Sequence, residues 1–447
     1  MAYASLLDRL GLHRRELRAW AYYDVANSAW MTTMLQAFGP AFFVPFAASQ
    51  LPPDVARSRF AFGTSAMVIA VGLLGPWLGA LADYKGRKKA FLGAFLGAGA
   101  ALTAALYLVR EGQWLLALAL YGLANVAVTS TLAFYNALLP GIARPDEVDR
   151  VSTAGFALGY LGGGLLFALN IWMMASPRTF GLASTVAAFQ ASCVMVAAWW
   201  VLFSIPLFRH VPEPVPRLDP DEPVGQSASR IALRRLAETF RELRQHRDAA
   251  LLLLAFLVYN DGVNTIIRMG TTFADEIGLP KGPTYAAVLM IQFVGIPFAF
   301  AFGMLADRIG AKRAIMLALA VYTVLTVLAY GLSTIGQFFA FAFTVAMVMG
   351  GVQALSRSLF ASLIPRHKAG EMFGFFGIFD RFGGAIGSSI FAVMIFFTGS
   401  SRPAILSHVA LFVVGGVLLA RVDVERGQRV AREAEAAAHE AGTAGVA

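Results

Sequence analysis

The sequence predicts an all-α integral membrane protein with twelve transmembrane helices in two pseudo-symmetric six-helix bundles. Three observations lead to this prediction. Hydrophobic residues make up 58% of the 447 residues and charged residues only 14%, whereas soluble domains carry about 25% charged residues. Twelve apolar stretches are each long enough to cross a bilayer, which takes about 20 residues. Two motifs of the first half of the chain return in the second half.

The twelve predicted spans divide the chain into five parts. The parts are a cytoplasmic segment (1–18), a six-helix bundle (19–207), a cytoplasmic linker (208–248), a second six-helix bundle (249–421) and a cytoplasmic tail (422–447). The spans cover about 20–46, 60–82, 88–110, 114–139, 152–175, 182–207, 249–274, 284–306, 312–333, 337–364, 372–397 and 404–421.

The distribution of Lys and Arg sets the predicted orientation. If the amino terminus is cytoplasmic, 27 of the 36 Lys and Arg residues fall in cytoplasmic segments, six in external loops and three inside spans. This is the positive-inside pattern of membrane proteins. We therefore expect both termini to be cytoplasmic, in a bacterial cytoplasmic membrane. The net charge of +9 is then a topology signal, and no nucleic-acid partner is expected.

The first span carries a polar motif that returns in the seventh span, 237 positions later. The two copies read Tyr22-x-Asp24-x-x-Asn27-Ser28 and Tyr259-x-Asp261-x-x-Asn264-Thr265. On a helix, the carboxylate, the amide and the hydroxyl share one face. A carboxylate within the bilayer costs roughly 3 kcal/mol, so this face must contact protein or water. Near Pro40 and Pro45 we expect a kink in the first span.

A second motif follows the second span and returns after the eighth, 224 positions later. The copies read Gly79-x-Leu-Ala-Asp83-x-x-Gly86-Arg87-Lys88-Lys89 and Gly303-x-Leu-Ala-Asp307-x-x-Gly310-Ala311-Lys312-Arg313. Two repeated motifs indicate two homologous halves, as in many transporters. Each aspartate is either a cap of the following helix or part of a cytoplasmic latch. For the latch we expect partners such as Glu147, Asp149 or Glu371.

Polar residues also follow one face of the fourth and tenth spans, and glycines crowd the fifth and eleventh. Asn125, Thr129 and Asn136 form the first polar face, and Gln353 and Arg357 belong to the second. Glycines let membrane helices approach closely. Between the halves, the Pro-rich start of 208–248 predicts an extended linker, and its second part an amphipathic helix on the membrane surface.

Metal, cofactor and enzyme functions find no support in the sequence. The six histidines have no metal-ligand spacing, and no phosphate-binding Gly-x-x-x-x-Gly-Lys-Ser/Thr loop is present. A lipid hydrolase or acyltransferase would need a nucleophile and a base at one membrane interface, and the histidines are not placed for it. A sensor would need a soluble domain larger than the linker. Trp20 and Trp200 are expected at the membrane interface or facing lipid.

The motif that begins at Gly79 resembles the signature between helices 2 and 3 of the major facilitator superfamily. Further stretches resemble its vacuole-effluxer branch, whose fungal members export amino acids from the vacuole. These stretches are Tyr22–Ser28, Phe134–Pro140, Gly159–Gly164, Tyr259–Gly262 and Gly350–Ser358. The resemblance implies that helices 1, 4, 7 and 10 line a central cavity. Asp380-Arg381, where many relatives have Lys, and Ala311, where an Arg is usual, depart from the pattern.

Six charged residues lie within predicted spans, and their charges cancel, which favours pairing. They are Asp24, Asp261, Asp380, Arg268, Arg357 and Arg381. Structural ion pairs between helices and cavity-lining residues remain equal alternatives for each of them. The aspartates follow the internal repeat, whereas Arg268 and Arg357 break it. We favour these arginines as anion anchors, because a guanidinium binds a carboxylate with two hydrogen bonds.

We predict a secondary active transporter of a small polar or zwitterionic, amino-acid-like solute, proton-coupled and monomeric, with no cofactor. A transporter or flippase of lipids or other amphiphiles is the alternative. Asp24 and Asp261 are the expected proton-coupling residues, with Asp24 preferred. The expected substrate-binding residues are Arg357, Arg268, Asp24, Asn27, Asp261, Asn264, Asn125, Gln353, Tyr22 and Tyr259. The expected gating residues are Asp83, Arg87, Asp307, Lys312, Arg313, Asp380 and Arg381.

Overall fold

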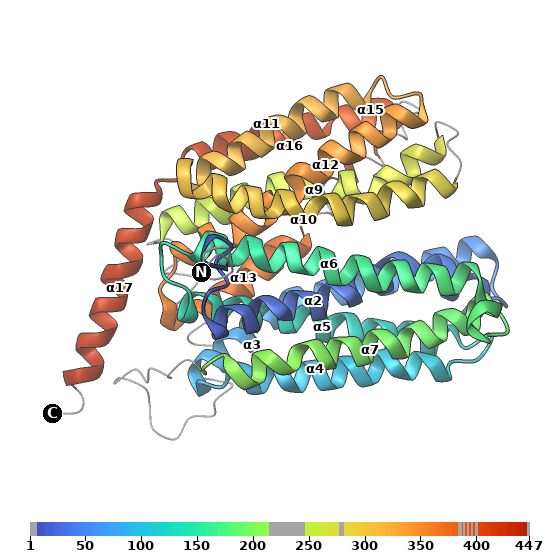
Figure 1. The fold of residues 1–447 in the computed structure, drawn as a ribbon, viewed down its shortest axis with the longest axis horizontal. Coiled ribbons are helices and arrows are strands. Elements are labelled where there is room, and N and C mark those ends of the chain that lie inside the picture. Colours follow the sequence, from blue (N-terminus) through green and yellow to red (C-terminus); the bar gives the residue numbers. More distant parts are fainter. Residues whose placement is uncertain are drawn as a thin grey trace.

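The fold consists of two groups of roughly antiparallel helices that lie side by side (Figure 1). The computed structural model describes residues 7–213, 246–276, 281–382 and 401–444, with a few positions between 387 and 397. In this part of the chain, every regular element is helical. The first group holds α2 to α7 and the second α9 to α16.

The helices of the first group agree closely with the predicted spans. They are α2 (Arg15–Ala37) with its continuation η1 (Phe38–Ala47), α3 (Pro53–Lys85), α4 (Lys88–Ala105) with η2 (Leu106–Leu108), α5 (Trp114–Ile142), α6 (Val148–Ala175), η3 (Pro177–Phe180) and α7 (Thr185–His210). The expected irregularity near Pro45 takes the form of π-helical winding, because η1 contains this proline and a proline cannot donate a backbone hydrogen bond.

The second group repeats the arrangement. Its members are α9 (Arg247–Glu276), α10 (Lys281–Ile309), α11 (Ala311–Ala329), α12 (Ile335–Ser362), η4 (Arg366–Lys368), α13 (Ala369–Phe382), α15 (Ser401–Leu406) and α16 (His408–Ala420). The last helix, α17 (Val424–Ala444), stands across one end of the bundle (Figure 1). Across the described residues, eight helices are long and apolar enough to cross a membrane.

Glycines of α6 allow this helix to lie directly against α2. A Cβ atom at Gly155 would overlap the carboxylate of Asp24, and one at Gly162 would overlap Val25. A side chain at Gly163 would likewise meet Thr32. The glycine-rich fifth span therefore brings α2 and α6 close together, as small residues do in membrane proteins. Because α6 also packs against α10 and α12, it connects the polar face of α2 to the second half.

One expectation from the sequence, the placement of two tryptophans, needs correction. Another, the helix in the linker, falls outside the described residues. Trp20 and Trp200 are fully buried, so the lipid-facing packing expected as one alternative for them is wrong. Both rings pack inside the first half, in the hydrophobic core. The amphipathic helix expected in the linker falls in 214–245, which lies outside the described residues.

Candidate functional site

A buried ion pair joins the two halves. Asp24 of α2 and Arg357 of α12 are 6% and 4% exposed. Nη1 and Nη2 of Arg357 each lie 3.3 Å from Oδ2 of Asp24. The two residues come from pseudo-equivalent halves of the chain, 333 positions apart. The pair is therefore a direct polar link between the bundles.

The guanidinium of Arg357 is otherwise bound almost entirely by the first half. Nε donates to the hydroxyl of Ser152 at 2.9 Å, and Nη2 donates to the Ser152 carbonyl at 2.8 Å. Nη1 also lies 3.4 Å from Oδ1 of Asn136. The Ser152 hydroxyl donates in turn to the carbonyl of Ala354 on α12. Arg357 thus occupies a polar socket made by α2, α5 and α6.

Aromatic rings cover this socket. The guanidinium carbon lies 4.5 Å from the ring centre of Phe156, 4.8 Å from Trp20 and 5.6 Å from Tyr135. Such cation–π contacts strengthen when water is excluded. The Tyr135 hydroxyl donates to Oδ2 of Asp24 at 2.8 Å. Trp20 stacks on Tyr135 and donates to its carbonyl, which fixes the tyrosine that holds the carboxylate.

The buried ion pair stabilises the protein only while Asp24 and Arg357 remain in contact. Removing one member of a buried ion pair costs about 3–5 kcal/mol, because the other charge remains desolvated and uncompensated. The two halves therefore cannot separate around Asp24 and Arg357 unless water, a proton or another charged group replaces the lost partner.

Asp261, the second copy of Asp24, lies in a different environment. Its side chain is fully buried and lies against Gly387, where a Cβ atom would overlap its carboxylate. The neighbouring Asn260 donates to Asp380 at 2.9 Å. Tyr259 shares a 2.6 Å hydrogen bond with Ser356 of α12. All these contacts stay within the second half. The side chains of Arg268 and Arg381 lie outside the described part of the structure.

The other predicted substrate residues are spread along the spans. Asn27 is buried, and its Oδ1 atom has no hydrogen-bond partner among the described residues. Asn125 accepts a long bond of 3.5 Å from Thr129, while Asn264 and Gln353 are half-buried. Tyr22 is 42% exposed, and its neighbour Tyr23 takes the buried position instead. Of the predicted substrate residues, Asp24 and Arg357 are therefore in direct contact, whereas Tyr22 lies at the surface.

The loop aspartates each reach the opposite half at the end of the bundle where the amino terminus lies. Asp83 pairs with Lys88 at 2.7 Å and accepts a 2.9 Å hydrogen bond from the backbone N–H of Glu371 at the start of α13. Glu371 was an expected partner, and it meets Asp83 through its backbone N–H group. An anion at a helix N-terminus is favoured by the exposed N–H groups and the helix dipole.

Asp307 makes the pseudo-equivalent contact with a side chain. It pairs with Arg150, near the start of α6, at 2.7 Å, and both side chains are about one-third exposed. Lys312 does not join this contact but donates to the carbonyls of Ala420 and Val422. Arg87 and Arg313 are exposed. The two contacts connect the halves at the same end of the bundle through different chemistry.

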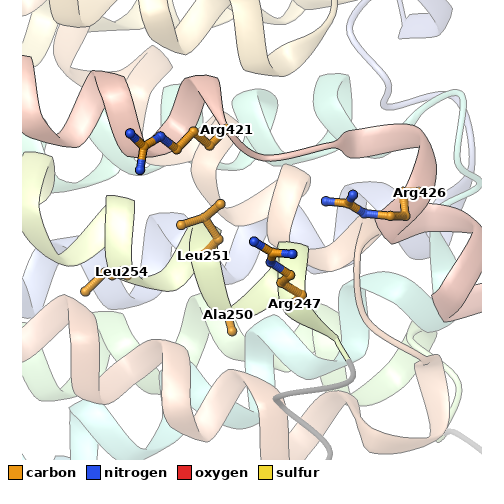
Figure 2. A pocket seen from close by; sticks show the side chains of 6 residues that line it. All are labelled: Arg247, Ala250, Leu251, Leu254, Arg421 and Arg426. Carbon is orange, nitrogen blue, oxygen red and sulfur yellow. The ribbon is translucent and has the colours of Figure 1, made fainter.

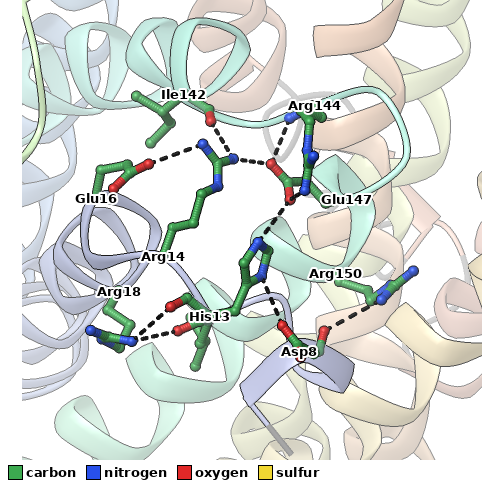
Figure 3. A network of polar contacts seen from close by, with 10 residues as sticks. Asp8, His13, Arg14, Glu16, Arg18, Ile142, Arg144, Glu147 and Arg150 are labelled. Carbon is green, nitrogen blue, oxygen red and sulfur yellow. Dashed lines mark hydrogen bonds and ion pairs between the residues drawn. The ribbon is translucent and has the colours of Figure 1, made fainter. Parts of the chain in front are cut away.

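Glu147, the other glutamate expected in the latch, holds the amino-terminal segment instead (Figure 3). Its carboxylate binds Arg14, lies 3.4 Å from Arg144 and is 3.5 Å from His13. Arg150 also donates to the backbone carbonyl of Asp8. The amino-terminal segment is thereby connected to the residue that pairs with Asp307.

Sequence reasoning missed Trp20, Tyr135, Ser152 and Phe156 as parts of the socket. Trp20 precedes Asp24 by one helical turn, so the shared face was detectable. Tyr135 stands next to Asn136, which belongs to the predicted polar face of the fourth span. Ser152 and Phe156 carry no comparable signal, because only the packing of α6 against α12 brings them to Arg357.

Comparisons with known proteins match most of the chain. The sequence model described as "Vacuole effluxer Atg22 like" matches residues 54–149 and 146–432. YxiO of Bacillus subtilis, an uncharacterized MFS-type transporter, is 35% identical over 94% of this chain and 97% of its own. Autophagy-related protein 22 of Yarrowia lipolytica is 28% identical over 65% of this chain, which spans about half of that protein.

Solved structures share the architecture at low sequence identity. The human organic anion transporter MFSD10 has a TM-score of 0.68 and 15% identity, covering 91% of this chain and 99% of its own. The Escherichia coli fucose:proton symporter FucP has a TM-score of 0.65 and 15% identity, covering 92% and 98%. At such identities the likeness concerns the fold alone, which is that of the major facilitator superfamily. It confirms the predicted arrangement of twelve helices in two bundles.

Proposed function

The chain belongs to the Atg22-like vacuole effluxer family of major facilitator transporters, and from this premise we propose that it carries a small zwitterionic solute in exchange for protons. That it is an integral membrane transporter follows from the family. The amino-acid-like substrate and the proton coupling are our proposal. The observation that carries the proposal is the buried Asp24–Arg357 pair between the halves.

A zwitterion offers the two charges that this pair would lose on separation. A solute carboxylate suits the forked guanidinium of Arg357, which can donate two parallel hydrogen bonds. A solute ammonium group suits the carboxylate of Asp24. Exchange of the internal pair for two protein–solute pairs leaves no buried charge without a partner. The substrate would thus compensate for the separation of the halves, which the ion pair otherwise resists.

Protonation of Asp24 provides a second way to release the pair. A neutral carboxyl group offers a negative charge neither to Arg357 nor to a solute ammonium group. A proton and the zwitterion would therefore compete for Asp24. Negative coupling of this kind, which is reciprocal, is a requirement for exchanging one species for the other. We keep Arg268 and Asp261 as further candidates for the site in the second half.

Asn27 is the first candidate for a neutral contact to the solute. It lies one helical turn after Asp24, and its buried Oδ1 atom has no partner in the described structure. A buried amide oxygen without a partner is costly, and a ligand donor would satisfy it. The proposed site therefore combines a negative, a positive and a neutral polar group.

The loop contacts of Asp83 and Asp307 are proposed to act as the gate at the same end as the termini. We further propose that this end is cytoplasmic, that the protein lies in the cytoplasmic membrane of a bacterium, and that it acts as a monomer. Labelling of a cysteine at Ser176 from outside the cell tests the orientation, because this position precedes η3 at the opposite end. Labelling only from the cytoplasm would reverse it.

A ligand screen on the purified protein tests the proposed substrate class. A ligand that binds the folded state raises its apparent stability by mass action, by about 2.7 kcal/mol at one hundred times the dissociation constant. We expect stabilisation by one or more amino acids and none by the matching amines or by sugars. Stabilisation by lysolipids alone would contradict the proposal and favour an amphiphile as the substrate.

A further inference from the structure

A cavity that does not include Asp24 or Arg357 lies beside the junction of α16 and α17. Its volume is about 540 Å³, and six residues line it: Arg247, Ala250, Leu251, Leu254, Arg421 and Arg426. Figure 2 shows Arg247 and Leu251 on α9 facing the segment that carries Arg421 and Arg426. The cavity thus combines three arginines with an apolar wall.

The lining changes from basic to apolar along the direction of the membrane spans. Arg247 is the first residue of α9, and Arg421 directly follows the last residue of α16. Leu251 and Leu254 follow one and two turns further into α9. Leu254 is 44% exposed, so the apolar wall continues on the outer surface of the bundle, where lipid tails lie. The arginines lie at the ends of two spans, where lipid headgroups are expected.

The charges around the cavity leave it positive. Arg426 is fixed by two hydrogen bonds of 2.7 and 2.8 Å to Asp248. Asp248 also accepts a bond from the backbone N–H of Asp423, which anchors the start of α17 to α9. Arg247 and Arg421 are both exposed. The lining therefore holds three arginines, of which Arg426 is paired with Asp248.

We propose that this cavity binds an anionic phospholipid. The phosphate would lie between Arg247, Arg421 and Arg426, and an acyl chain would run along Leu251 and Leu254. Basic pockets between membrane helices at a headgroup boundary suit acidic lipid headgroups, and arginine binds phosphate with two hydrogen bonds. A free anion would use the arginines but not the apolar wall. Because Arg426 lies at the start of α17, the bound lipid would also hold this helix against α9.

Photo-crosslinking to lipid tests the site directly. The full-length protein is reconstituted in phosphatidylcholine vesicles that contain a photoactivatable phosphatidylglycerol, and crosslinked peptides are mapped by mass spectrometry. We expect crosslinks at Leu251 and Leu254. Substitution of both Arg247→Gln and Arg421→Gln should lower the affinity for phosphatidylglycerol by about 30-fold, given the usual contribution of an arginine near an anionic surface.

A matched pair of arginines on α17 provides the control. Arg429 is 66% exposed and pairs only loosely with Glu433 at 3.9 Å, and Arg432 binds the carbonyl of Gln428 on its own helix. The double variant with Arg429→Gln and Arg432→Gln makes the same change in net charge and should retain full lipid affinity. An equal loss in both double variants would reduce the effect to general charge and overturn the site.

Two further outcomes would also overturn the proposal. Equal crosslinking of a photoactivatable phosphatidylcholine would show that the cavity does not select an anionic headgroup. Displacement of the lipid by inorganic phosphate or glycerol 3-phosphate at affinities equal to that of the lipid would show a free-anion site. Preference for phosphatidylglycerol with neither soluble anion competing supports the lipid site.

Discussion

Asp24 and Asp261 occupy equivalent positions in the two halves, yet their surroundings differ. Asp24 binds Arg357 of the opposite half and Tyr135 of its own. Asp261 is buried against Gly387 within the second half. Duplication has thus kept the carboxylate, whereas the residues around it decide whether it links the halves. The comparison suggests that Asp24 responds to movement between the halves, while Asp261 chiefly stabilises one of them.

The difference originates in the asymmetry of α5 and α12. Position 132 of α5 is the repeat equivalent of Arg357, and a leucine stands there. The first half therefore offers Asp261 no arginine in the place from which Arg357 reaches Asp24. In return, the first half supplies the Ser152 and Trp20 contacts that hold the guanidinium. A single charged residue on one helix gives the two halves different roles.

Arg357→Ala should have the largest effect on this comparison. It leaves Asp24 buried without its cation, so we expect a loss of about 3–5 kcal/mol in the free energy of unfolding. Binding of an amino-acid ligand should fall below detection. Arg357→Lys should recover little of either, because an ammonium group cannot reproduce the contacts to Asp24 and both Ser152 oxygens. Thermal denaturation and ligand-induced stabilisation measure the two effects.

A second substitution separates the charge from the packing. Adding Asp24→Asn to Arg357→Ala removes the orphaned carboxylate and should restore part of the lost stability. The coupling free energy from the double-mutant cycle should exceed about 1 kcal/mol, as expected for residues in direct contact. Additive losses would show that the two residues do not stabilise each other.

Asp261→Asn should have a smaller effect and of a different kind. The substitution keeps the volume of a buried group but removes its charge, so we expect a loss of about 1–3 kcal/mol in stability. Proton-driven accumulation of substrate should persist in proteoliposomes, because the contact between the halves stays intact. Loss of accumulation with unchanged stability would make Asp261 the equal of Asp24 and end the proposed division of roles.

Asp307→Asn should have the smallest effect, and Asp83→Asn a clearly larger one, because it leaves the buried Lys88 without its carboxylate. Asp83 is buried with Lys88 and the start of α13, whereas Asp307 and Arg150 are about one-third exposed. Exposed ion pairs contribute only about 0–1 kcal/mol. The labelling rate of a cysteine at Thr153, which packs against Gly303, in a Cys193→Ala background reports the opening of this end. Equal rates in the parent and the Asp83 variant would leave Asp83 as a local helix contact.

The repeated motifs and apolar periodicity were enough to predict the bundle. Twelve spans, two halves and the close approach of glycine-rich α6 to α2 depend on local composition and on spacing that a single chain displays. The sequence limits the possible partners of Asp24 to the charged residues within spans, but it does not identify Arg357 among them. Six charged residues in spans allow several combinations, and only the packing of α6 between α2 and α12 selects this one.

Trp20 shows why the burial of a side chain was harder to predict than the position of a membrane span. Tryptophan is common at membrane interfaces, and Trp20 opens the first apolar stretch, so the general preference placed it at the surface. In the structure its ring stacks on Tyr135 and covers Arg357. A cation that needs shielding overrides the general preference, but the cation lies 337 positions away in the sequence. Long-range partners of this kind leave no local pattern.

Transport by Asp24→Asn in proteoliposomes tests the central claim most directly. The asparagine keeps the shape of the carboxylate and can still accept hydrogen bonds from Tyr135 and Arg357, but it cannot bind or release a proton. We predict that accumulation driven by a proton gradient disappears. Counterflow exchange of the same amino acid should continue at lower affinity, because the amide oxygen can still accept a hydrogen bond from the solute ammonium group. Accumulation at the wild-type level by Asp24→Asn would contradict the account. So would loss of both accumulation and exchange in a folded protein, which would make Asp24 a ligand-binding or structural residue without a role in coupling.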